Sequence, residues 1–219
     1  MNMKKTQHPP KPSGADKYDR RSFIIKGFCS SLGITLSTGL LISSHISCSG
    51  NKKSKAEIHK QLDELVDKYF PVFGTCSQTS FQALNKTFNL KADKFVKALA
   101  SLPGIALRGE TCGAVSGCLL AISLAYEEDN INDKVKQKLS REPSFTFCSK
   151  FESEYSSTRC RNIIEHLTKK KYNISKPEDY KILAQEGVYK NCPGVVKKAV
   201  HFAADIILEK SVLSPKTGK

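Results

Sequence analysis

The chain has 219 residues, of which 39% are hydrophobic, and a formal net charge of +14. This length suits one domain with an N-terminal extension, and the hydrophobic content supports one modest core. The charge alone does not indicate nucleic-acid binding, because no basic stretch is interleaved with aromatic residues and no DNA- or RNA-binding motif is present. A basic surface near an anionic membrane explains the charge equally well, and no nucleic-acid partner is expected.

The first segment, residues 1–49, has the composition of a polar tail followed by an export signal. Residues 1–17 are polar and basic and are expected to be disordered. Arg20 and Arg21 precede Phe23, an aliphatic pair, a lysine and a mildly apolar run. This pattern resembles a twin-arginine export signal. The resemblance implies export of a protein that is already folded, often because a cofactor was inserted beforehand.

The end of the signal allows two kinds of membrane attachment. Cys48 follows a small residue and precedes a polar tether, as at a lipoprotein junction, but His45 stands where a lipobox has leucine. An uncleaved signal is the alternative anchor, since the apolar run has sufficient length although it is weakly apolar. Either attachment would place the protein on the periplasmic or outer face of a membrane.

Residues 50–219 are predicted to form an all-α domain, a compact orthogonal or bundle-like arrangement of about six to eight helices. A capping box opens a first amphipathic helix over residues 54–70. A second helix is predicted to begin at Cys76, with Thr75 placed to cap it. A third, shorter helix stops before Pro103, a residue that disfavours continuation of a helix.

The central helix follows a glycine-bearing loop, with Thr111 placed as its cap and Cys112 in its first turn. Gly113, Gly117 and Ala121 are spaced i, i+4, i+8, so another backbone or a cofactor can approach that side closely. The Cys112 thiol would face the positive end of the helix dipole, which favours the thiolate and lowers the pKa. The alternative is a buried cysteine in a tightly packed helix.

Three further segments complete the predicted domain. Beyond Pro143 a helix with an aromatic face includes Tyr155, and another helix carries Cys160 in its first turn. Residues 172–187 are polar and have room for one short helix. The last helix is predicted to start at Cys192, where the following proline fits the first helical position.

Four cysteines share one feature, a position at the start of a predicted helix: Cys76, Cys112, Cys160 and Cys192. Helix starts supply free amides and a positive potential, which suit thiolates, sulfur clusters and anions. The chain has no close cysteine pair of the kind found in zinc ribbons and ferredoxins, and no Cys-x-x-Cys. Any site that these four cysteines share must therefore be assembled by the tertiary fold.

Other candidate residues are interpreted as structural. Cys118 and Cys148 lie on apolar helix faces and are predicted to be core thiols, and Cys29 lies inside the export signal. His166 and His201 lie on helices that carry cysteines and could act as ligands, although a packed or surface histidine is the commoner case. No hydrolase or transferase motif is present, so enzymatic activity is left undecided.

The cysteine pattern resembles the redox-active C-GCAxxG-C-C family over about residues 70–210. The features that carry the resemblance are Cys76, the segment Gly109–Gly117 with its Cys-Gly-Ala-x-x-Gly motif, Cys160 and Cys192. The resemblance implies a helical domain with four functional cysteines and a redox or metal role.

The leading hypothesis is an exported, membrane-tethered helical protein that holds an iron–sulfur or other metal centre for electron transfer. The four helix-start cysteines would ligate the metal, with Gly113 and Gly117 beside them, and a membrane electron-transfer protein or transporter would be the partner. One alternative is a thiol–disulfide protein without metal, and another is a binding module whose cysteines only staple its helices. A shared site requires at least three of the four sulfurs to lie close together.

Overall fold

The structure is a computed structural model that describes residues 53–127 and 138–213, so the predictions for Arg20, Arg21 and Cys48 lie outside the described residues. In these two ranges the chain forms eight α-helices and no strand, which confirms the predicted all-α class. None of the described helices is long and apolar enough to cross a membrane. The α-helices are α1 (Lys55–Phe73), α2 (Cys76–Phe88), α3 (Gly104–Leu107), α4 (Gly113–Tyr126), α5 (Arg141–Tyr155), α6 (Cys160–Thr168), α7 (Pro177–Gln185) and α8 (Cys192–Leu213), and the 3₁₀ helices include η1 (Asp93–Leu99) and η3 (Val188–Asn191).

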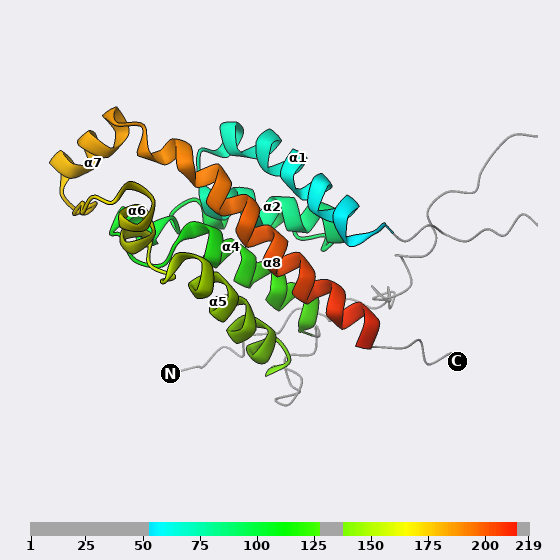
Figure 1. The fold of residues 1–219 in the computed structure, drawn as a ribbon. Coiled ribbons are helices and arrows are strands. Elements are labelled where there is room, and N and C mark those ends of the chain that lie inside the picture. Colours follow the sequence, from blue (N-terminus) through cyan, green and yellow to red (C-terminus); the bar gives the residue numbers. More distant parts are fainter. Residues whose placement is uncertain (1–52, 128–137, 214–219) are drawn as a thin grey trace, which may run out of the picture. The chain divides into compact units, whose positions relative to one another are not determined.

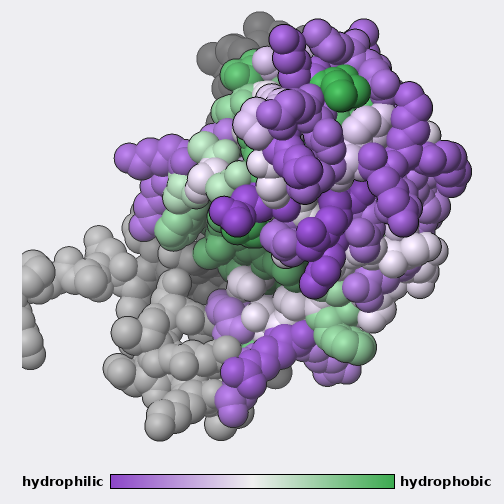
Figure 2. All heavy atoms as spheres, turned by 90° about the vertical axis from the view of Figure 1, so that its left-hand side faces the viewer, coloured by the Kyte–Doolittle hydropathy of each residue, from purple (hydrophilic) through white to green (hydrophobic). Residues whose placement is uncertain are grey.

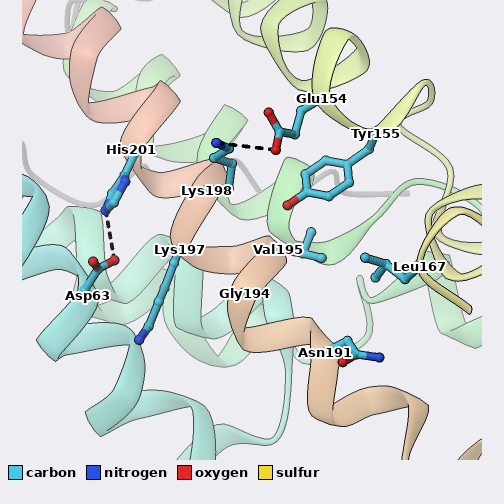
Figure 3. A pocket seen from close by; sticks show the side chains of 10 residues that line it. All are labelled: Asp63, Glu154, Tyr155, Leu167, Asn191, Gly194, Val195, Lys197, Lys198 and His201. Atoms are coloured by element: carbon cyan, nitrogen blue, oxygen red, sulfur yellow. Dashed lines mark ion pairs between the residues drawn. The ribbon is translucent and has the colours of Figure 1, made fainter.

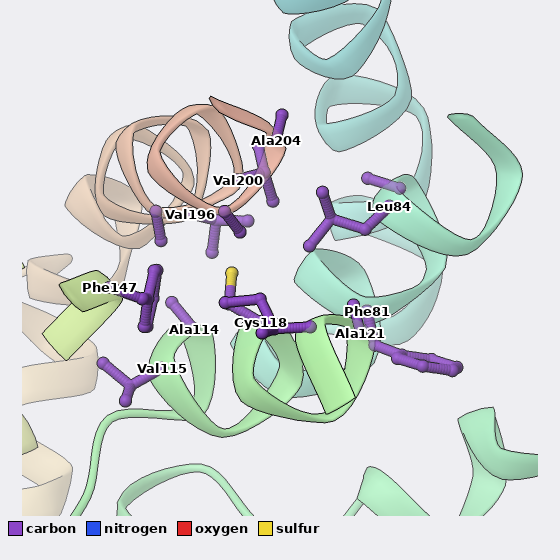
Figure 4. Packing of buried hydrophobic residues seen from close by; sticks show 14 of the residues in the cluster. Phe81, Leu84, Ala114, Val115, Cys118, Ala121, Phe147, Val196, Val200 and Ala204 are labelled. Atoms are coloured by element: carbon purple, nitrogen blue, oxygen red, sulfur yellow. The ribbon is translucent and has the colours of Figure 1, made fainter. Parts of the chain in front are cut away.

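The long helix α8 runs across the domain, with α1 and α2 on one side and α4 and α5 on the other (Figure 1). The main core lies between these five helices, and Cys118 of α4 stands at its centre with Phe81, Phe147 and Val200 around it (Figure 4). A smaller hydrophobic cluster joins α6, α7 and η3 at one end of the domain. The four helix-start cysteines lie toward this end.

Helix α1 forms where the sequence places its signals. The Ser54 amide donates to the Glu57 carboxylate at 2.6 Å, and the Glu57 amide donates to the Ser54 hydroxyl at 3.2 Å, which completes the capping box. The helix continues through Pro71 to Phe73, three residues past its predicted end. It ends at Gly74, whose φ of 63° suits a residue without a Cβ.

Helix α2 is buried on several sides, although much of its sequence is polar. Ser77, Thr79 and Ser80 are all fully buried. Their hydroxyls donate to backbone carbonyl oxygens, as in the 2.7 Å bond from Ser77 to Leu99 and the 2.8 Å bond from Thr79 to Thr75. Because the hydroxyls of these short side chains form hydrogen bonds with backbone carbonyl oxygens, they can be buried, and α2 can pack closely against α1, α4 and α8.

The small-residue side of α4 is covered by the backbone of α2. A Cβ built on Gly113 would lie 2.9 Å from the Ser77 amide nitrogen and 3.2 Å from the Cys76 Cβ. A Cβ on Gly117 would lie 3.0 Å from the Phe81 amide nitrogen. The sequence left open whether a backbone or a cofactor occupies this side, and the structure places a backbone there.

Several predicted helix boundaries are wrong in detail. Thr75 precedes α2 but makes no cap to the backbone, since its hydroxyl donates to the Gln78 side chain at 2.8 Å. Thr111 does not cap α4, because it pairs with Arg159 in an isolated antiparallel bridge. Pro143 lies inside the first turn of α5 rather than before it. The predicted third helix is the 3₁₀ helix η1.

Candidate functional site

The four helix-start cysteines come together in space from four different elements. Each of the six pairs among them interacts electrostatically, so that one thiol of the pair shifts the pKa of the other. All six cysteines in the described ranges are free thiols. In these same ranges, no three histidine, cysteine, aspartate or glutamate side chains are arranged to hold a metal ion. The members of the group are Cys76, Cys112, Cys160 and Cys192, called here the four-cysteine site.

Backbone pairing joins the two segments that carry Cys112 and Cys160. The Cys112 amide donates to the Thr158 carbonyl oxygen at 2.8 Å, and the Cys160 amide donates to the Glu110 carbonyl oxygen at 2.6 Å. The Arg161 guanidinium reinforces this contact with a 2.6 Å ion pair to the Glu110 carboxylate. The loop before α4 is therefore joined to the start of α6, and each segment contributes one cysteine.

Cys76 reaches the site because α2 and α4 start at the same place. The absence of a side chain at Gly113 allows the first turn of α2 to approach α4. A Cβ added at Gly113 would lie only 3.2 Å from the Cys76 Cβ. Any larger residue at position 113 would push Cys76 away from Cys112. The close packing of Cys76 at this point of the site therefore explains why position 113 is glycine.

Among the four cysteines, Cys76 and Cys192 affect each other's ionisation most strongly. A hydrogen bond between their two thiols raises the pKa of Cys76, and burial raises it further. The same bond lowers the pKa of Cys192 against the opposing effect of burial. The asymmetry favours a thiolate on Cys192 with the Cys76 thiol as the donor, since a charged sulfur is the stronger acceptor.

The other two thiols have raised pKa values. Burial raises the pKa of Cys112 to about 11, although the amides of Ala114 and Val115 oppose this shift. Burial and the neighbouring thiols also raise the pKa of Cys160. The prediction that a helix start lowers the pKa of Cys112 is therefore wrong, because desolvation outweighs the amides and the dipole.

The residues interpreted as structural occupy packed positions. Cys118 is fully buried in the main core, as predicted, whereas Cys148 is only partly buried because Phe147 and Phe151 take the core side of α5. His201 stacks on His59 with ring centroids 4.1 Å apart. These observations agree with packing roles.

A shallow pocket of about 560 Å³ opens between α1, α5 and α8 beside the start of α8 (Figure 3). Asn191 and Gly194, on either side of Cys192 in the sequence, line it, and a Cβ on Gly194 would meet open space. Its charged walls pair with one another, as in the 3.4 Å contact of Lys198 with Glu154. Hydrophilic residues cover most of the domain end that carries α6 and α7, with a hydrophobic band at its centre (Figure 2).

Sequence reasoning missed Tyr189, which lies in η3 close to the four-cysteine site. Its pKa is raised by burial first and also by the nearby Cys160, Cys192 and Cys76. The available signal was its position three residues before Cys192, where a 3₁₀ turn brings side chains into line. The sequence offered no reason to expect that turn.

A helical domain that gathers four free cysteines at helix starts defines a class of small helical proteins with a thiol cluster. The chain belongs to the C_GCAxxG_C_C family, whose description is "Putative redox-active protein (C_GCAxxG_C_C)" and whose model matches residues 74–206. The matched range includes all of the four-cysteine site. Comparisons with curated proteins and with solved structures found no match.

Proposed function

We propose that this protein is a dithiol–disulfide redox protein in which Cys192 and Cys76 are the working pair. The observation that carries the proposal is the gathering of four free thiols, among which Cys76 and Cys192 act on each other most strongly, with the pKa of Cys192 lowered and that of Cys76 raised. A nucleophilic thiolate beside a protonated resolving thiol is the arrangement that thiol–disulfide exchange needs. The description of the family as redox-active is consistent with this arrangement.

The proposed exchange takes place in two steps. The Cys192 thiolate attacks one sulfur of a disulfide in the substrate, the substrate S–S bond breaks, and a mixed disulfide forms with release of a substrate thiolate. That thiolate takes the proton from Cys76, whose sulfur then attacks the Cys192 sulfur and releases the second substrate thiolate. Two electrons pass to the substrate disulfide, and a Cys76–Cys192 disulfide remains.

The first experiment oxidises the full-length reduced protein with an excess of oxidised glutathione and maps disulfides by peptide mass spectrometry. The expected product is a Cys76–Cys192 disulfide that re-reduces with a defined midpoint potential. Cys76→Ser and Cys192→Ser should each abolish it. Cys148→Ser is the matched control, since this half-buried thiol of α5 lies outside the four-cysteine site. Wild-type protein that forms no such bond under these conditions would refute the proposal.

A cysteine-ligated metal centre, including an iron–sulfur cluster, is the second candidate. The observation that favours it is the interaction among all four thiols, because soft sulfur donors suit zinc and iron–sulfur clusters. Metal binding would require these side chains to move, since no three of them in the described ranges are arranged to hold a metal ion. Cys76, Cys112, Cys160 and Cys192 would hold the metal, and a cluster would supply one-electron transfer. Anaerobic purification with metal analysis and an absorption spectrum tests this. Stoichiometric metal that is lost in Cys112→Ser and kept in Cys118→Ser would favour this candidate.

We also propose export through the twin-arginine route with attachment to the outer side of a membrane. The support is the Arg20–Arg21 pattern and the junction at Cys48. The double variant Arg20→Lys, Arg21→Lys should retain the protein in the cytoplasm, as fractionation would show. Labelled fatty acid that is incorporated by the wild type and lost in Cys48→Ser would identify the lipid anchor, and undiminished export of the double variant would point to another pathway.

A further inference from the structure

The side chain of Tyr189 has a buried hydroxyl oxygen with no hydrogen-bond partner within the described part of the chain. A buried hydroxyl that lacks a partner destabilises a fold, and phenylalanine would occupy the same space without this cost. Such a group in a packed region calls for a partner, either a water molecule or a protein group that becomes an acceptor in another state. The position of the ring indicates which state that is.

The Tyr189 ring packs into the smaller hydrophobic cluster together with Cys160, and its centroid lies 5.8 Å from that of Tyr180. The Cys192 amide donates its hydrogen bond to the Tyr189 carbonyl oxygen, where η3 passes into α8. Residues three apart on a 3₁₀ turn have side chains one above the other, which places the ring on the Cys192 side of the turn.

The Tyr189 hydroxyl is protonated at neutral pH and can therefore act as a hydrogen-bond donor. Its pKa is raised by burial, by Tyr180 and by the thiols of Cys160, Cys192 and Cys76, so the group keeps its proton at neutral pH. A phenol that keeps its proton can donate a hydrogen bond. The groups near it that would gain most from a donor are thiolates, because a hydrogen bond to a charged acceptor is about twice as strong as one between neutral groups.

We propose that the Tyr189 hydroxyl donates a hydrogen bond to the Cys192 sulfur when this sulfur is a thiolate, and that Tyr189 is thereby a positioning residue for the nucleophile. The inference rests on the proposed dithiol–disulfide function. In the neutral dithiol the Cys192 sulfur interacts with the Cys76 thiol, and the Tyr189 hydroxyl has no hydrogen-bond partner among the described residues. When the sulfur carries charge, it accepts from both groups, so the thiolate becomes more stable relative to the disulfide.

Tyr189→Phe in the full-length protein tests this, with Tyr180→Phe as the matched control. Tyr180 is the neighbouring ring and is 39% exposed, so solvent can satisfy its hydroxyl. Without the Tyr189 hydroxyl, the equilibrium against a glutathione couple should shift about tenfold toward the disulfide, which corresponds to a potential about 30 mV more negative. Alkylation of Cys192 by iodoacetamide at neutral pH should slow by only about threefold, because the smaller thiolate fraction is offset by greater nucleophilicity.

The outcomes separate the inference from the function on which it rests. If wild type shows no Cys76–Cys192 couple, both are withdrawn. If wild type shows the couple and Tyr189→Phe keeps its potential while its thermal stability rises, the hydroxyl is only a packing defect and the Tyr189 inference is overturned. Slower alkylation of Cys160 with unchanged alkylation of Cys192 would also overturn it, since the bonded sulfur would then be a different one.

Discussion

The contact between α2 and α4 at Gly117 tests whether the close approach of these helices holds the domain together. A Cβ at this position would lie 3.0 Å from the Phe81 amide nitrogen, and it would come closer still to the Ser77 carbonyl oxygen and the Ser80 hydroxyl. Two of these three atoms belong to backbone and cannot rotate away. Gly117→Ala therefore requires α2 and α4 to move apart, in an interior that is packed without spare volume.

The expected magnitude follows from two opposing effects. Overpacking of this kind costs about 1–3 kcal/mol, and the backbone contacts place Gly117→Ala near the upper end. Replacing glycine by alanine inside a helix returns about 0.5–1 kcal/mol. The net loss is about 2 kcal/mol, which for a domain of this size lowers Tm by about 4–8 °C.

The assay is thermal unfolding of the full-length reduced protein, followed by circular dichroism. The matched control is Gly194→Ala in α8, where an added Cβ meets open space. This control should gain about 0.5–1 kcal/mol, because the helical backbone suits alanine better than glycine. A Gly117→Ala variant with the same Tm as wild type, or a higher one, would refute the packing argument.

Three further predictions concern titration and backbone strain. The hydrogen bond from the Ser54 amide lowers the pKa of Glu57 below its usual 4.5. The Glu57 carboxylate therefore stabilises the fold above pH 4.5, and this stabilisation is lost as the pH falls through the lowered pKa. Between neutral pH and about pH 3, the Tm of Glu57→Gln should fall less than the Tm of wild type. Because the pKa of Cys192 is lowered and that of Cys112 is about 11, iodoacetamide should label Cys192 first in the folded protein, as peptide mass spectrometry would show. Ala106 has φ 54°, so Ala106→Gly should leave the Tm of wild type unchanged or raised, whereas alanine-to-glycine changes inside helices cost about 1 kcal/mol.

Much of the fold could be predicted because the helix signals are local. Prolines and apolar spacing indicated the starts of α2 and α8 at Cys76 and Cys192 and placed Cys160 in the first turn of α6, and the structure has these three residues first in their helices. The end of α1 could not be predicted in the same way. Pro71 lies in the last turn of that helix, where the loss of one backbone hydrogen bond is tolerated, and Gly74 provides the actual stop.

The apolar pattern of the sequence could not predict how completely α2 is buried. The apolar residues Ala83 and Leu84 are fully buried, but Ser77 and Ser80 are fully buried too and are equally part of the interior. Whether a serine is buried depends on a backbone carbonyl being available to its hydroxyl, which is decided by tertiary structure. Hydrophobic periodicity therefore underestimates how many neighbours such a helix has.

The candidate site could be predicted as a set of residues but not as an arrangement. Cys76, Cys112, Cys160 and Cys192 share a sequence feature, whereas their grouping depends on contacts such as the bridge between Thr111 and Arg159. A position at a helix start would have the same effect on the pKa of each of the four thiols. Burial differs from one to the next, and only Cys192 has a lowered pKa.

The turn α3 explains part of this difference between the thiols. Gly104, Ile105, Ala106 and Leu107 all have positive φ, which costs about 1–2 kcal/mol for each residue other than glycine. The turn persists because its amides are paired, as in the 2.8 Å bond from Ala106 to Ser101. At its start a Cβ on Gly104 would lie only 3.6 Å from the Cys160 sulfur, so the turn closes over that thiol. The strained turn thus contributes to the burial of Cys160, and this burial raises the pKa of its thiol.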